Sequence, residues 1–117
     1  MTYNSSITFG GITMRVMSND LIPVEGTHKQ IIGNVVKLKP APEKGLEWRG
    51  AISGMFFDSN RNTDKTSLQD IKNNALKVEL SDGEHNGEYY ILNLRWQDNS
   101  GSSATRWLYQ MEIVEDV

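Results

Sequence analysis

Alternation of apolar and polar residues is the dominant pattern along this chain, and it predicts mostly β structure. The alternation is clearest between residues 46 and 57, where every second residue is apolar or glycine. The face that we expect to point into the core consists of Leu46, Trp48, Gly50, Ile52, Gly54 and Phe56. Glycine weakens a strand unless the strand bends there or a neighbouring aromatic side chain lies over its backbone. The two glycines of this face therefore predict a strongly curved sheet.

Shorter strands are expected in the first third of the chain. Residues 7–17 contain two β-like pieces joined by Gly10-Gly11, which favours either a tight hairpin or one bulged strand. Residues 19–29 show little periodicity and predict an exposed loop that could serve as a contact surface. Residues 30–38 are rich in β-branched side chains and predict one strand. This strand should end before Pro40, because proline cannot donate a hydrogen bond to a sheet ladder.

One helix is expected, near residues 66–75. The polar run 58–65 that precedes it predicts a loop. Thr66 and Gln69 then have the spacing of a capping box, in which each side chain satisfies a free backbone amide at a helix start. Apolar residues follow at helical spacing, at Leu68, Ile71 and Ala75. This single apolar stripe predicts a helix that lies on the sheet and exposes its other faces.

The last third of the chain predicts three more strands, over residues 76–80, 89–96 and 104–114. Asp-Gly and Asn-Gly dipeptides between the first two predict a hairpin connection. A Gly/Ser/Asn-rich loop is expected at 97–103. The core faces that we expect are Tyr90, Leu92, Leu94 and Trp96 on one strand, and Trp107, Tyr109, Met111 and Ile113 on the other.

These elements predict a single domain that spans residues 1–117. The fold class is mostly β (α+β), a small β-barrel or β-sandwich of about six to eight antiparallel strands with one short helix packed on it. The 117 residues are enough for one core, to which three Trp, four Tyr and three Phe bring large apolar side chains. The formal net charge of −3 shows none of the basic excess that is typical of nucleic-acid binders.

Residues suited to catalysis are few. The sequence contains no cysteine and only two histidines, His28 and His85, both in polar segments where we expect solvated surface side chains. Neither Ser53 nor Ser67 lies in the Gly-x-Ser-x-Gly turn of a nucleophilic serine. Gly10-Gly11 is followed by another β-like piece rather than by a helix that could bind a phosphate. We therefore expect neither catalysis nor a cofactor.

A metal site was considered in the polar run 58–65. Oxygen-bearing side chains alternate there as at the start of an EF-hand loop. The pattern then fails, because Thr63 stands where the loop needs glycine and Gln69 stands where it needs a bidentate glutamate. We interpret the run as a hydrophilic loop and expect no bound metal.

Two groups of aromatic residues could face a partner. Trp48, Trp96, Trp107, Tyr90 and Tyr109 could form a stacking platform for sugars or bases, but their alternation favours core packing. The Met55-Phe56-Phe57 run puts large apolar groups on both faces of one strand, which a domain of this size cannot easily bury. The residues that we predict to form an interface are Met55, Phe57, Asp58, Asn60 and Arg61.

Several segments together give the chain a resemblance to a known family. They are Phe9-Gly10-Gly11-Ile12, the strand at 46–57, the helix around Leu68-Gln69-Asp70-Ile71, the segment 87–96 and the terminal strand. Over residues 7 to 114, this pattern resembles small tail proteins of tailed phages. The group includes tail-tip, distal-tail and baseplate-hub proteins and those of related contractile injection particles.

The resemblance implies a small β-barrel or sandwich with a helix, no catalytic residues, and assembly into a ring at the tail tube end or baseplate hub. The implied partners are copies of the chain itself and other tail or baseplate proteins, without specific nucleic-acid binding or membrane insertion. The implied location is the virion tail, assembled in the host cytoplasm. Because contacts in this family are spread over strand edges and loops, no single functional residue carries over. A β-sandwich module that binds carbohydrate or protein is the alternative that the aromatic content leaves open.

Overall fold

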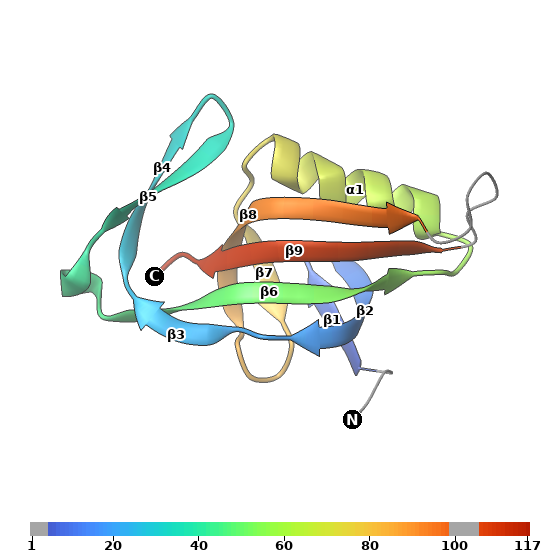
Figure 1. Cartoon of the computed structure of the whole chain (residues 1–117), viewed down its shortest axis with the longest axis horizontal. Helices are drawn as coiled ribbons and strands as arrows, with labels where there is room; N and C mark the ends of the chain where they lie inside the picture. The colour runs from blue at the N-terminus through green and yellow to red at the C-terminus, as the bar shows by residue number, and fades with distance from the viewer. Residues whose placement is uncertain (1–4, 99–105) are drawn as a thin grey trace.

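The structure, a computed structural model, describes residues 5–98 and 106–117. Within these residues the chain forms nine strands, one α-helix and one short 3-10 helix (Figure 1). Their bounds are β1 Ser5–Phe9, β2 Ile12–Asn19, β3 Ile22–Glu25, β4 Thr27–Ile32, β5 Val35–Pro40, η1 Pro42–Lys44, β6 Leu46–Phe56, α1 Arg61–Asn73, β7 Val78–Ser81, β8 Gly87–Asp98 and β9 Trp107–Glu115. The described helices include none that is long and apolar enough to cross a membrane.

Seven of the strands form one antiparallel sheet in the order β2-β1-β7-β8-β9-β6-β3. A further pairing between β2 and β6 closes the first six of these strands into a barrel. The seventh, β3, pairs with the start of β6 as an extra strand. The predicted small, mostly β barrel with one short helix is confirmed, and the sandwich alternative is not what the chain forms. Strands β4 and β5 pair only with each other and extend from one end of the barrel (Figure 1), where β5 lies against β8.

Gly54 marks the point where the barrel closes. It pairs with Val16 of β2 on one side and with Tyr109 of β9 on the other. A Cβ atom at this position would overlap the carbonyl oxygen of Arg15 and would lie 2.6 Å from the Tyr109 hydroxyl oxygen. Glycine therefore lets β2 approach β6 closely enough to pair with it. The prediction that an aromatic side chain lies over the backbone of a curved strand is confirmed at this glycine.

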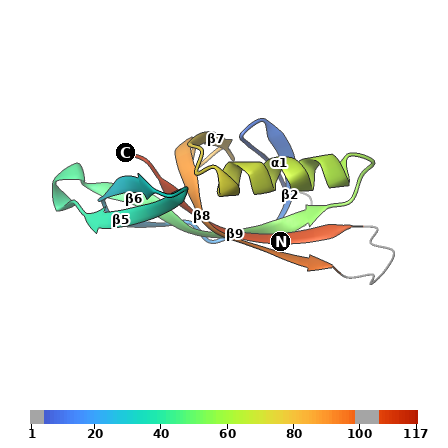
Figure 2. The same ribbon diagram turned by 90° about the horizontal axis from the view of Figure 1, so that it is seen from above.

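The core fills the barrel and the space under α1. The largest fully buried apolar side chains are Tyr89, Tyr109, Phe9, Met14, Ile52, Leu68, Leu80, Met111 and Ile113. The helix contributes Leu68 and Ile71, as its apolar stripe predicts. Figure 2 shows α1 lying along one side of the strands, with the β1–β2 hairpin beside it. The burial of Tyr109, Met111 and Ile113 confirms the face predicted for the last strand.

The first third of the chain differs from the prediction. The hairpin over residues 7–17 is confirmed as β1 and β2. The loop predicted at 19–29 is wrong, because β3 and the start of β4 lie there. The single strand predicted at 30–38 is also wrong. Gly33 and Asn34 have φ angles of 58° and 62°, and two successive left-handed residues turn the chain into the β4–β5 hairpin.

The helix begins at Arg61, five residues before the predicted start at Thr66, so the predicted loop at 58–65 is largely wrong. Hydrogen bonds within the preceding turn organise this start. The Asn60 amide donates to the Asp58 side chain at 2.9 Å, and the Arg61 guanidinium donates to the Asp58 carbonyl at 3.2 Å. At the other end, Ala75 is buried but lies beyond the helix with a φ angle of 49°.

Two predicted core faces are corrected by the structure. The register of β8 against β9 shifts between Ile91 and Asn93, so Tyr89 and Ile91 face the core before the shift. After it, Leu94 and Trp96 pack against the core. The prediction of one continuous alternation over 89–96 is therefore wrong, because the irregularity after Ile91 changes which residues face the core. At the start of β6, Leu46 is exposed and Glu47 is buried, which is the reverse of the prediction for these two residues. Of the loop predicted at 97–103, residues 97 and 98 belong to β8 and the rest lie outside the described residues.

Candidate functional site

The β4–β5 hairpin, residues 27–40, extends from one end of the barrel and is called the arm below (Figure 1). Large apolar side chains near its turn are exposed to solvent: Ile31 is 48% exposed, Ile32 is 55% exposed and Val35 is 47% exposed. Soluble proteins tolerate single exposed apolar residues, but several together are typical of a contact surface. A two-stranded hairpin on its own is also only marginally stable in water. The arm is therefore the element of this fold that most needs a partner.

The base of the arm is fixed by a buried ion pair. Lys29 Nζ lies 2.6 Å from Glu47 Oε1, and the two side chains are only 2% and 0% exposed. Glu47 also accepts hydrogen bonds from the Thr27 amide at 2.9 Å and from the Thr27 hydroxyl at 2.8 Å. Burying two charges is costly unless both are paired and hydrogen-bonded, and here both are. This network joins β4 to the start of β6 and sets the direction in which the arm leaves the barrel.

A second ion pair on the arm differs in its environment. His28 Nε2 lies 3.1 Å from Glu43 Oε2 of η1, and these side chains are 56% and 67% exposed. Exposed pairs of this kind contribute little to stability, because water and salt screen them. Lys29 and Glu47 therefore stabilise the position of the arm, while His28 and Glu43 form an exposed pair on its surface. The prediction of a surface position for His28 is confirmed.

The residues that we predicted to form an interface lie at the far end of β6 and at the start of α1. Met55 is half-buried on β6, and Phe57 is exposed with the Arg15 guanidinium 4.8 Å from its ring centroid. Asp58, Asn60 and Arg61 form the turn that starts the helix. A cleft of about 230 Å³ brings Met55, Phe57 and Asp58 together, whereas Asn60 and Arg61 do not line it.

His85 is buried, so the prediction of a solvated side chain is wrong for this histidine. Its Nδ1 lies 2.7 Å from Asp82 Oδ2, and its ring meets the edge of Trp48 at a centroid distance of 4.4 Å. Asp82 also accepts hydrogen bonds from the Asn19 side chain and from the backbone amides of Glu84 and His85. These contacts order the turn between β7 and β8.

The carboxyl of Asp82 is subject to opposing influences. Burial raises its pKa, but the hydrogen bonds from His85, Glu84 and Asn19 favour the ionised form more strongly and lower the pKa to about 2. A His–Asp pair can serve as the base of a nucleophilic triad. In the described residues, the other polar contact of the His85 ring is to the Glu84 carboxylate at 3.6 Å, which is not a nucleophile of that kind. The His85–Asp82 pair therefore stabilises the turn between β7 and β8.

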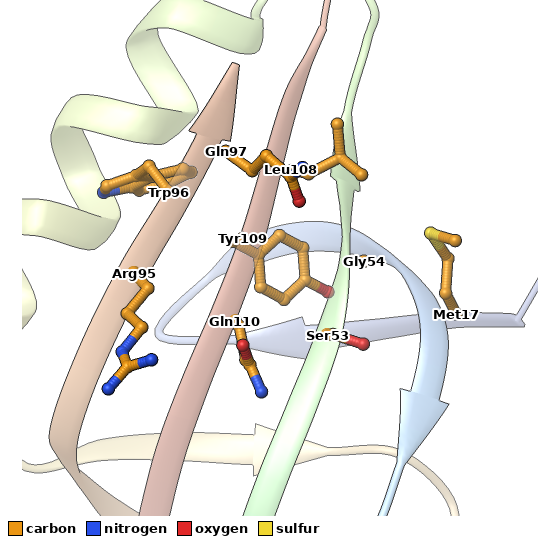
Figure 3. Close-up of a pocket in the computed structure, with 9 residues that line it drawn as sticks. All are labelled: Met17, Ser53, Gly54, Arg95, Trp96, Gln97, Leu108, Tyr109 and Gln110. Atoms are coloured by element: carbon orange, nitrogen blue, oxygen red, sulfur yellow. The ribbon is translucent and has the colours of Figure 1, made fainter. Parts of the chain in front are cut away.

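A hollow of about 500 Å³ lies against β2, β6, β8 and β9 (Figure 3). Its walls include Arg95, Gln97, Gln110 and Tyr109. The Tyr109 hydroxyl already donates to the Arg15 carbonyl at 2.7 Å, so it is engaged in closing the barrel. Figure 3 shows the long side chains of Arg95 and Gln110 extending away from the strands without converging on a common point. The hollow therefore presents no assembled set of reacting groups.

The aromatic residues divide between the core and its margin. Tyr109 is buried, and Trp48 and Trp96 pack partly buried against the core, as the alternation predicts. Trp107 is half-buried and donates from Nε1 to the Asn62 side chain at 2.8 Å. The Lys65 ammonium lies 3.4 Å from the centroid of Trp107 and 5.5 Å from that of Trp96. One face of Trp107 is thus covered by a lysine of α1.

Among the described residues, no three acidic or histidine side chains are placed to hold a metal ion. The EF-hand-like run of the sequence is mostly helical in the structure. No protein-family model matches the chain, and no curated protein sequence is similar enough to be matched to it. The arm, with its exposed tip and fixed base, is therefore the candidate functional site. Its turn could have been predicted from Gly33-Asn34, a dipeptide typical of tight hairpins, whereas nothing in the local sequence marks Glu47 as buried.

Proposed function

We propose that the protein is a structural subunit of a phage tail or related injection particle, and that it assembles into a ring at the end of the tail tube or in the baseplate hub. The family assignment rests on the resemblance of residues 7 to 114 to small tail proteins. Its partners are then further copies of the chain and neighbouring tail or baseplate proteins. The protein would then be located in the virion tail, as one part of the assembled particle.

The observation that carries the assembly function is the arm. Its base is locked by the buried Lys29–Glu47 pair, while Ile31, Ile32 and Val35 remain exposed near its tip. A rigid base with an apolar tip suits a contact that is made with little loss of conformational entropy. An arm on one side of a subunit and an acceptor elsewhere on the next form a heterologous contact, which generates a ring when the rotation closes.

The alternative, a carbohydrate-binding module, has less support from the geometry. Sugars stack on exposed aromatic faces, and Lys65 lies over Trp107 while Trp48 and Trp96 pack against the core. The hollow of Figure 3 offers half-buried Trp96 among polar side chains, but no pair of aromatic faces placed to hold a ring. A glycan titration followed by tryptophan fluorescence distinguishes the two functions, because exposed stacking residues respond to a ligand and buried ones do not.

The direct test is oligomeric state, measured by light scattering and by electron microscopy of negatively stained particles. The wild-type protein, alone or co-expressed with tail proteins, should form rings. Ile32→Asp should leave it monomeric with an unchanged far-UV circular dichroism spectrum, because Ile32 is exposed and its replacement disturbs no core packing. Asn93→Asp adds the same charge at an exposed polar position of β8, outside the arm, and should assemble normally. A wild-type protein that stays monomeric at high concentration and binds no tail protein would refute the proposal.

A further inference from the structure

Charge is unevenly divided between the arm and the rest of the chain. The arm contains Lys29, Lys37 and Lys39 and no acidic residue. Because the whole chain has a formal net charge of −3, the remainder carries −6. Lys29 is paired inside the base, whereas Lys37 and Lys39 are exposed on β5. The arm thus combines an apolar tip with a basic strand.

A groove of the opposite character lies between α1 and the β1–β2 hairpin, which Figure 2 shows side by side. It has a volume of about 590 Å³ and is called the aspartate groove below. The charged residues that line it, within the described part of the chain, are Asp58, Asp64 and Asp70. Its apolar lining comes from Ile12, Ile71 and Leu76, and Leu76 is exposed.

Two of the carboxylates, Asp58 and Asp64, lie close enough for one to affect the other. Partial burial and the neighbouring charge of Asp58 raise the pKa of the Asp64 carboxyl. A cation placed nearby would offset the repulsion between these two carboxylates. The Asp70 side chain and the Asp58 carboxylate lie near opposite ends of α1, so the negative potential extends along the helix.

From this complementarity we propose that the arm of one copy docks in the aspartate groove of the next copy. Ile32 and Val35 would cover the apolar lining, and Lys37 and Lys39, which lie on the same face of the arm, would face the aspartates. The dimensions agree, because α1 with its 13 residues is about 20 Å long and a six-residue strand of the arm spans about 20 Å. The contact is heterologous, since arm and groove belong to different parts of one molecule, and it can therefore repeat around a ring.

This inference rests on the proposed assembly function, and cross-linking can test it separately. The chain contains no cysteine, so introduced cysteines react only with each other. One preparation carries Ile32→Cys and a second carries Ser67→Cys, in the groove lining of α1. Mixed under mild oxidation, the two should form a disulfide-linked dimer on a non-reducing gel. Asn73→Cys, an exposed position of α1 outside the groove lining, is the matched control and should cross-link at least about tenfold less.

A charge exchange tests the electrostatic half of the proposal. Lys37→Glu with Lys39→Glu on the arm should weaken assembly by at least about tenfold, and Asp64→Lys with Asp70→Lys in the groove should do the same. One chain that carries all four substitutions should assemble again, because its acidic arm then meets the basic groove of the next copy. Lys72→Glu with Arg95→Glu, which changes charge by the same amount outside both the arm and the groove lining, should leave assembly intact.

The possible outcomes separate the two proposals. If rings form but Ile32→Cys cross-links only to a second Ile32→Cys, the arms pair with each other and the groove assignment is wrong, while the assembly function stands. If rings form only with another tail protein and neither cysteine pair reacts, the arm serves that partner and the groove assignment is again wrong. If the protein never assembles, both proposals fail. Cross-linking to Ser67→Cys together with rescue by the fourfold charge-exchanged variant supports both.

Discussion

The Tyr109 hydroxyl on β9 donates a hydrogen bond to the Arg15 carbonyl on β2 at 2.7 Å, across the position of Gly54 on the strand between them. Three strands thus meet at one point, and the barrel closes there. The contact depends on the missing side chain of Gly54, because a Cβ atom would overlap the oxygen that accepts the hydrogen bond. Closure is therefore a local steric condition as well as a result of the overall alternation of apolar residues.

Gly54→Ala is expected to destabilise the protein. The added methyl group must push β2 or the Tyr109 ring aside, and such overpacking costs about 1–3 kcal/mol in the free energy of unfolding. Chemical denaturation measures this loss. Gln110→Ala, at an exposed position of the paired strand β9, should change the free energy of unfolding by less than about 0.5 kcal/mol. Equal stability of Gly54→Ala and the wild type would mean that β2 does not close on β6 as described.

Alkaline pH should unfold the protein through two buried tyrosines. Burial raises the pKa of Tyr109, and burial together with the charges of Glu115 and Asp82 raises that of Tyr89, both from an ordinary value of 10.0. The folded state therefore holds two protons that the unfolded state releases above pH 10. The stabilising contribution is complete below pH 10 and falls by about 2.7 kcal/mol per pH unit above it.

Substitutions show how much each tyrosine contributes to the fall in stability with rising pH. Tyr109→Phe should lower the starting stability by about 0.5–1.5 kcal/mol, because it removes the hydrogen bond to Arg15. It should also halve the alkaline slope in urea unfolding measured between pH 9 and pH 12. The double variant with Tyr89→Phe should lose most of the slope. A double variant as alkali-sensitive as the wild type would show that other groups drive the alkaline transition.

The sequence predicts this barrel well where a strand follows one regular alternation. Strand β9 alternates from Tyr109 to Ile113, so the core face predicted for it is correct over that stretch; the alternation ends at Val114, which is buried as well. Strand β8 contains a shift beyond Ile91, and a bulge leaves no mark in the pattern until the paired strand is known. The helix start at Arg61 was missed for a related reason. The first turns of α1 bury no apolar residue, and distant contacts such as Asn62 with Trp107 fix them instead.

The candidate site was less predictable than the fold. Gly33-Asn34 could have indicated the arm, because both residues adopt left-handed φ angles that other side chains disfavour. Glu47 could not have been recognised as buried. Its partner Lys29 lies 18 positions earlier, and charged residues that alternate with apolar ones normally face solvent. His85 was misjudged likewise, since its burial against Trp48 depends on a contact between distant segments.

Acid should weaken the turn between β7 and β8. The pKa of Asp82 is lowered to about 2 from an ordinary value of 3.8, so its ionised form stabilises the folded state. This contribution is complete above pH 4 and is lost as the pH falls from about 4 towards 2. The loss should amount to about 1–2 kcal/mol.

Asp82→Asn should remove this acid dependence and lower stability at pH 7 by a similar amount, measured by urea unfolding at pH 2.5, 4 and 7. Glu79→Gln, at an exposed position of β7 outside the aspartate groove, is the matched control and should unfold like the wild type at each pH. The NMR signals of the His85 ring would report the same loss locally, because Asp82 is its hydrogen-bond partner. An Asp82→Asn variant that retains the wild-type pH profile would contradict the assignment.

The base of the arm gives the sharpest stability contrast. Lys29→Met leaves the Glu47 carboxylate buried without its cationic partner, which should lower the free energy of unfolding by about 3–5 kcal/mol. Adding Glu47→Leu removes the unpaired buried carboxylate and should restore much of the lost free energy of unfolding. His28→Ala, which breaks the exposed pair with Glu43 on the same arm, should have no measurable effect.

Hydrogen exchange locates the effect of Lys29→Met within the chain. Amides of residues 27–40 should exchange faster than in the wild type, because the network with Glu47 is the side-chain link between the arm and β6 and adds to the backbone hydrogen bonds at Gly26. The same amides in His28→Ala should exchange at the wild-type rate. If Lys29→Met lowers overall stability but leaves arm exchange unchanged relative to the barrel, the ion pair serves the barrel and the arm is positioned by other contacts.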